Sequence, residues 1–167
     1  ADLRLSYASK EGFFLLGRKD VASAFSKNPD RIIGALRKVL NAFAVDAGKK
    51  ALMVLATKPL ASAFAKNPEK IADALAKLGS ESVNMYTRGR PAIWLLGKRE
   101  IAPAFAKNPD RIADALVKMG EALKDDAESA FFALSKKELA EAFAKNPEKI
   151  ADAFVNAGES LGDSTNS

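Results

Sequence analysis

The chain has 167 residues, of which 48% are hydrophobic and 28% are charged, the balance typical of a folded, water-soluble protein. It contains no cysteine and no histidine, which excludes disulfides, zinc sites built on these residues, and nucleophiles activated by a histidine base. The 26 basic and 21 acidic residues give a net charge of +5, a modest excess compared with dedicated nucleic-acid binders.

Neither a membrane segment nor a secretory leader is visible in the sequence. No apolar stretch approaches the roughly 18 residues that a membrane-spanning helix needs. We therefore expect a cytoplasmic protein without a membrane partner. The absence of thermolabile Cys and Gln side chains beside many charged ones is typical of a thermophilic source, with chance omission in a mesophilic chain as the alternative.

A nine-residue segment, residues 24–32, recurs in nearly the same form as residues 63–71, 104–112 and 142–150. The asparagines that anchor the four copies are separated by 39, 41 and 38 residues. Self-similarity at a period between about 20 and 50 residues indicates a stacked repeat array. We expect one domain over residues 1–157, with repeats at about 7–45, 46–79, 80–124 and 125–157, followed by a polar flexible tail over 158–167.

Each copy is predicted to contain three short helices. In the third copy these cover residues 91–97, 98–107 and 109–119, and apolar residues recur three or four apart in the last two. Pro103 is expected to shorten or bend the middle helix. The predicted fold class is all-α: an α-solenoid of four three-helix repeats of about 39 residues each, wound as a right-handed superhelix.

An Asn-Pro pair begins the third helix of each copy. The asparagine side chain can accept from free backbone N–H groups of the first turn, and proline is tolerated at the first helical position. An acidic residue follows, where the helix dipole favours it. We favour this structural role over a repeated ligand-binding role. The predicted helix caps are Asn28, Asn67, Asn108 and Asn146.

Equivalent large apolar residues predict rows of core side chains along the array. One row contains Phe25, Phe64, Phe105 and Phe143. We expect each phenylalanine to pack against the helices of the next copy. Trp94 aligns with Phe14, Met53 and Phe132. We interpret this second row as core rather than as a platform for a ligand.

The charged residues also repeat. A basic row follows the asparagines by three residues, and with a further set of cations it could form a positive edge that tracks phosphates. These residues are Arg31, Lys70, Arg111 and Lys149, with Lys19, Lys58, Arg99 and Lys137. However, Asp73 precedes Lys77 by four and Asp114 precedes Lys118 by four, which predicts ion pairs within the helices. Solvated charge pairing is therefore favoured over phosphate binding.

Candidate chemistry is sparse in this sequence. Carboxylates recur once per copy at Asp73, Asp114 and Asp152, too dispersed to share a proton or a metal ion. No Gly-rich phosphate loop follows an apolar strand. We therefore predict no catalytic, cofactor-binding or metal-binding residue, and no enzyme activity.

The least repetitive stretch covers residues 79–90 and contains Tyr86, Arg88 and Arg90. Irregular insertions in repeat proteins often map to a binding face, and Tyr and Arg are enriched at interface hot spots. These three residues are the candidate partner-binding residues. The alternative is an extended helix followed by a loop before Pro91.

Three short helices per 38–41 residues, with a tight Asn-Pro corner, resemble armadillo-like α-solenoids over nearly the whole chain. The Gly-rich corner and the Asn-bearing ligand ladder of armadillo proteins have no counterpart here. The Lys-Asn-Pro-acidic-basic-Ile motif resembles three-helix-repeat solenoids of hyperthermophilic archaea. The resemblance implies a fold and no activity.

The function expected from these observations is that of a non-catalytic scaffold, which presents a curved helical surface to a protein or peptide partner. One alternative is a basic helical-repeat module that binds nucleic acid through phosphate contacts without sequence preference. An enzyme of unrecognised type is a third class. No oligomeric state is predicted.

Overall fold

The computed structural model describes residues 7–79 and 90–165. Within them the chain is all-helical, without strands, and every helix packs against others. The first three helices are α2 (Ser9–Leu16), α3 (Lys19–Lys27) and α4 (Pro29–Ala42), followed by α5 (Val45–Leu55), α6 (Lys58–Lys66) and α7 (Pro68–Leu78). The second half contains α9 (Arg90–Leu96), α10 (Ala102–Lys107), α11 (Pro109–Leu123), the short 3-10 helix η1 (Lys124–Asp126), α12 (Ala127–Leu134), α13 (Lys137–Lys145) and α14 (Pro147–Thr165).

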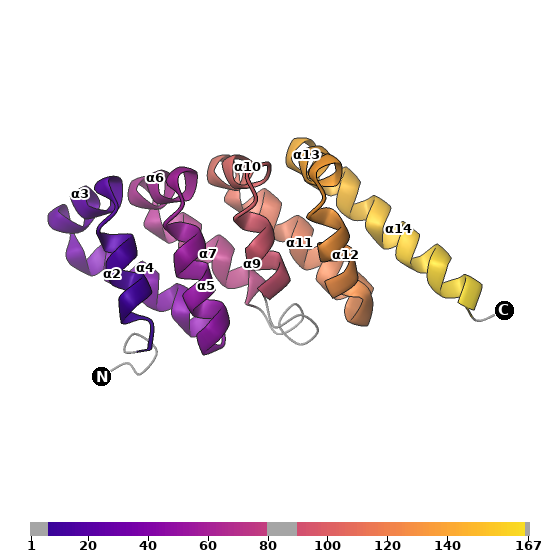
Figure 1. The fold of residues 1–167 in the computed structure, drawn as a ribbon, viewed down its shortest axis with the longest axis horizontal. Coiled ribbons are helices and arrows are strands. Elements are labelled where there is room, and N and C mark those ends of the chain that lie inside the picture. The colour runs from indigo at the N-terminus through magenta and orange to yellow at the C-terminus, as the bar shows by residue number, and fades with distance from the viewer. Residues whose placement is uncertain (1–6, 80–89, 166–167) are drawn as a thin grey trace.

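The helices form three rows, in which equivalent helices from consecutive sequence copies lie side by side (Figure 1). The front row contains α2, α5, α9 and α12. The corner row contains α3, α6, α10 and α13, and the rear row contains α4, α7, α11 and α14. Contacts between neighbours within each row join the copies, so the core is shared between them rather than closed within one copy.

The Asn-Pro corners turn the chain from the corner row into the rear row. Asn28, Asn67 and Asn146 each accept a hydrogen bond on Oδ1 from the backbone N–H three residues later, at 3.3–3.4 Å, which confirms three of the predicted caps. Asn108 has a similar backbone conformation, but its side chain makes no such bond. In all four corners the asparagine N–H donates to the carbonyl four residues earlier, which closes the preceding helix.

The middle helix of the third copy is shortened, as we predicted from the position of Pro103. It covers six residues, whereas α3, α6 and α13 each cover nine. Proline has no N–H to donate to the carbonyl of Arg99, so regular α-helix begins only at Ala102. The residues before it form turns in which Ala102 donates to Lys98.

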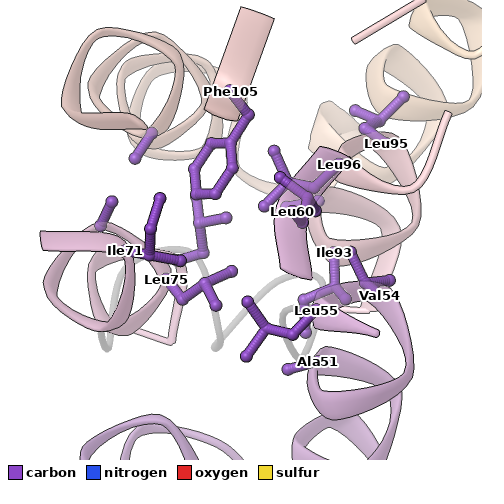
Figure 2. Packing of buried hydrophobic residues seen from close by; sticks show 14 of the residues in the cluster. Ala51, Val54, Leu55, Leu60, Ile71, Leu75, Ile93, Leu95, Leu96 and Phe105 are labelled. Carbon is purple, nitrogen blue, oxygen red and sulfur yellow. The ribbon is translucent and has the colours of Figure 1, made fainter. Parts of the chain in front are cut away.

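The phenylalanine row lies in the core. Phe64, Phe105 and Phe143 are fully buried, and Phe64 and Phe105 belong to one continuous apolar cluster. The Phe105 ring of α10 points toward Ile71 and Leu75 of α7 (Figure 2). We had expected each phenylalanine to pack against the next copy, whereas the Phe105 ring faces helix α7 of the preceding copy.

Core positions in the first and last copies are less buried than their equivalents in the middle copies. Phe25, which has no described copy before it, is only partly buried. Leu139 is equivalent to the buried Leu60 and Ile101, yet it is 36% exposed because no further copy follows α13 in the described chain. The burial of each position therefore depends on the copy beside it, as expected for a core shared between neighbours.

The rear row contains glycines where neighbouring helices approach closely. A Cβ added at Gly79 would lie less than 3.0 Å from the carbonyl oxygen of Ala42 in α4. A Cβ added at Gly158 would be as close to a methyl group of Leu123 in α11. Gly158 therefore provides room for packing and does not end the helix. Helix α14 continues through Gly158 to Thr165, where we had expected a polar flexible tail from residue 158.

Candidate partner-binding surface

A row of large apolar side chains faces solvent along the front helices. It consists of Phe14 of α2, Met53 of α5, Trp94 of α9 and Phe132 of α12, between 54% and 66% exposed. These residues are equivalent in the four sequence copies, and we call them the exposed row. Our interpretation of Trp94 and its equivalents as core residues was therefore wrong.

The local sequence explains why these side chains face outward. Each front helix has four consecutive apolar or small residues near its C-terminal end, such as Ile93 to Leu96 in α9. Successive residues of an α-helix point about 100° apart, so four in a row cover most of its circumference. Ile93, Leu95 and Leu96 are buried, and Trp94 takes the remaining, solvent-facing direction.

Lysine side chains lie over the rings of this row. The Lys50 Nζ of α5 is 5.9 Å from the centre of the Trp94 ring on the neighbouring helix α9. The Lys136 Nζ is 4.5 Å from the centre of the Phe132 ring. Both distances fall within the range of cation–π attraction. The exposed row therefore combines apolar area with positive charge.

A cleft opens between α9 and α12 within this row. It has a volume of about 530 Å³, and Trp94 and Phe132 both line it. Its charged lining residues are Lys98 and Glu128. A cleft of this size with exposed aromatic walls has the composition typical of ligand and peptide sites.

The rear row has a different surface, in which charges are paired across neighbouring helices. Arg31 of α4 donates from two nitrogens to both carboxylate oxygens of Glu69 in α7, at 2.6 and 2.8 Å. Arg111 of α11 binds Glu148 of α14 with the same distances. The hydrogen bond from each arginine is the main reason that the pKa values of Glu69 and Glu148 lie below their ordinary value.

The rear-row lysines form ion pairs with the following helix as well. Lys77 Nζ of α7 lies 3.1 Å from Asp110 and 3.0 Å from Asp114 of α11, and the bond to Asp114 is the largest cause of its raised pKa. Lys38 pairs with Asp73, and Lys118 pairs with Asp152. The pairs that we predicted within single helices, such as Asp73 with Lys77, are therefore wrong, because each lysine reaches the next helix of the row instead.

The predicted basic edge is partly neutralised by these pairs, since Arg31 and Arg111 are bound to glutamates. One stretch of positive surface persists at the corner row. A cleft of about 490 Å³ between α6 and α10 is lined by Lys66, Lys70 and Lys107, and its lining contains no carboxylate. The equivalent cleft between α3 and α6 contains Asp20.

The structure tests little of the predicted site over residues 79–90. Tyr86 and Arg88 lie outside the described residues. Arg90 is the first residue of α9, and its side chain is also outside the described part. Sequence reasoning missed the exposed row, although the run of four apolar residues in each front helix was a usable signal.

Two kinds of site, a metal cluster and a membrane-spanning helix, are absent from the described residues. Among residues 7–79 and 90–165, no group of three or more acidic side chains could hold a metal ion. No helix in this part of the chain combines the length and apolar character needed to cross a bilayer. Comparisons with models of protein families, with curated proteins and with solved structures found no match to this chain.

Proposed function

We propose that this protein is a non-catalytic α-solenoid scaffold that binds a segment of a partner protein across the exposed row. In this proposal the four sequence copies are the structural repeats, and the rows of Figure 1 continue as a right-handed, armadillo-like superhelix. The contacts between equivalent helices support the solenoid, because each copy shares its core with its neighbours. A cytoplasmic location and a thermophilic source belong to the same proposal.

The observation that carries the proposal is the exposure of four equivalent large apolar side chains. Scattered exposed apolar residues are normal, but a contiguous patch on a folded protein indicates an interaction site. The helices that bear the row are in contact from α2 to α12, and Trp94 and Phe132 line one cleft between neighbouring helices, which supports a shared face for these equivalent positions. Covering a half-exposed aromatic residue contributes on the order of 1–2 kcal/mol, enough for several positions to hold a peptide.

Selection from a random peptide library with the whole chain as bait tests the proposal. Trp94 is the only tryptophan, so its fluorescence reports directly on occupation of the row. We expect selected peptides to change this fluorescence, and we expect Trp94→Ser/Phe132→Ser to weaken their binding at least about tenfold, from the loss of two aromatic contacts. Binding to this variant is measured with labelled peptides.

The matched control is Leu161→Ser. Leu161 lies on α14, a rear-row helix, and is as exposed as the row residues. Its substitution is expected to leave peptide binding unchanged. Selection of no peptide, or of peptides that bind the row variant and wild type equally, would contradict the proposed function.

A second candidate function is phosphate binding without sequence preference at the corner row. The cleft lined by Lys66, Lys70 and Lys107 favours it, because no carboxylate in the lining repels an anion. Binding of random duplex and single-stranded oligonucleotides at increasing salt tests it, with a steep salt dependence as the expected result. Lys66→Gln/Lys107→Gln should then weaken binding. An absence of binding at low salt eliminates this candidate.

A further inference from the structure

The charges around the exposed row indicate which kind of segment it would accept. Lys50 lies on α5, and Lys98 and Lys136 follow the C-terminal ends of α9 and α12; none of the three takes part in an ion pair between described residues. Glu128 is the acidic residue in the cleft lining. The part of the row from α5 to α12 therefore presents apolar rings beside an excess of positive charge.

The spacing of the front helices limits the shape of the occupant. Neighbouring packed helices lie about 8–10 Å apart, and a chain extended in the polyproline II conformation advances about 3.1 Å per residue with three residues per turn. Such a segment, crossing the row, therefore places every third side chain on the face toward the row, one at each successive helix. The residues between these positions can face the lysines.

We infer that the occupant of the exposed row is an acidic, extended protein segment, with an apolar side chain at about every third position and carboxylates between them. This inference rests on the proposed function. The four row positions correspond to a segment of about ten residues. Its carboxylates neutralise Lys50, Lys98 and Lys136, while its apolar side chains enter the cleft between Trp94 and Phe132.

Two other classes of partner fit this surface less well. Single-stranded nucleic acid needs free ring faces for base stacking. However, ammonium groups already lie over the rings of Trp94 and Phe132, and Glu128 in the cleft repels phosphates. A lipid surface is broad and smooth, whereas the row contains a concave cleft that a narrow chain can fill. Both classes are included as outcomes of the test.

The test compares two labelled 12-residue probes on the whole protein by fluorescence anisotropy at low salt. Both probes have phenylalanine or leucine at every third position. The first has glutamate at the remaining positions, and the second has lysine there. We expect the acidic probe to bind about tenfold or more tightly than the basic one, from three exposed ion pairs, and the difference to shrink as salt rises.

Two triple variants, each of which removes three positive charges, test whether the tighter binding of the acidic probe depends on the lysines beside the row. Lys50→Gln/Lys98→Gln/Lys136→Gln should reduce the difference between the probes to less than about threefold. Lys19→Gln/Lys27→Gln/Lys145→Gln removes three lysines that lie at the ends of corner-row helices, and it should leave the difference intact. Equal effects of the two variants would overturn the inference, because they would indicate long-range charge rather than contacts at the row.

Failure of this inference is distinguishable from failure of the proposed function. If both probes bind equally and both lose binding in Trp94→Ser/Phe132→Ser, the row binds segments without regard to charge, and only the inference is overturned. If neither probe binds, the inference is also overturned. Binding of single-stranded oligonucleotides or anionic phosphatidylserine vesicles instead, lost in the Trp94→Ser/Phe132→Ser variant, would overturn the inference and the proposed function together.

Discussion

The phenylalanine row of the corner helices and the exposed row of the front helices have similar spacing along the chain but opposite environments. Phe64, Phe105 and Phe143 are fully buried, whereas Trp94 and Phe132 are more than half exposed. Both rows arise because each sequence copy repeats its apolar positions. Repetition alone therefore indicates equivalence between positions, and it does not indicate which positions face the core.

The difference between the rows lies in their helices. The corner helices are strongly amphipathic, so each has a single apolar face, and the phenylalanine must lie on it. The front helices α2 and α12 are apolar on more of their circumference. An extra apolar side chain that packing does not require is consequently left on the surface, where it is available to a partner.

The largest predicted effect is a difference in the free energy of unfolding between substitutions in the two rows. Phe105→Ala should lower the free energy of unfolding by about 3–5 kcal/mol, because it leaves a cavity among residues from neighbouring helices. Trp94→Ala should lower it by about 1 kcal/mol or less, since the ring is half exposed. Urea unfolding followed by circular dichroism measures both. A comparable loss in the two variants would contradict the assignment of Trp94 to the surface.

The second prediction compares two rear-row glycines, one at a close contact between helices and one in open space. Gly79→Ala should destabilise the protein by about 1–3 kcal/mol, because the new methyl group would clash with the backbone of Ala42. Gly34 of α4 has open space around it, so Gly34→Ala should stabilise the helix by about 0.5–1 kcal/mol. Thermal unfolding distinguishes the opposite signs. A stabilising effect of Gly79→Ala would contradict the close approach of α4 and α7.

Much of the fold could be predicted from the sequence, because local signals determined it. Asn67 and Pro68 define a helix boundary by the hydrogen bonds that they make or lack, and the structure places that boundary as expected. Pro103 shortened its helix for the same local reason. In contrast, the end of α14 could not be predicted, because the role of Gly158 depends on its contact with Leu123 of another helix.

The rear-row ion pairs could not be predicted because they depend on neighbours from other copies, whereas the candidate surface had a local signal that was overlooked. Lys77 has a suitable partner four residues before it in Asp73, yet it binds Asp110 and Asp114 of the next helix instead. Trp94 is a large apolar residue at a repeated position, and we took repetition as a sign of burial, although Ile93, Leu95 and Leu96 beside it already cover the buried sides of the helix. The ion-pair error therefore arose from treating one copy at a time, and the Trp94 error from equating repetition with burial.

The smallest predicted effect concerns the ion pairs that link neighbouring helices of the rear row. Hydrogen bonds from Arg31 and Arg111 lower the pKa values of Glu69 and Glu148 below the ordinary 4.5. Each pair therefore stabilises the fold fully above the unfolded-state pKa, and this stabilisation is lost as the pH falls through the folded-state value. The side chains are about half exposed, so solvent screening keeps the effect small.

Thermal unfolding of wild type and of Glu69→Gln/Glu148→Gln at pH 7 and pH 3 measures this contribution. The wild type should be the more stable of the two at pH 7, and the difference should be smaller at pH 3, because the stabilisation is lost as the pH falls toward the lowered folded-state pKa values of the two glutamates. Glu138→Gln/Glu141→Gln is the matched control, because these carboxylates lie on α13 outside the described ion pairs. If the control loses as much stability at pH 7, the contribution comes from overall charge rather than from pairing between neighbouring helices.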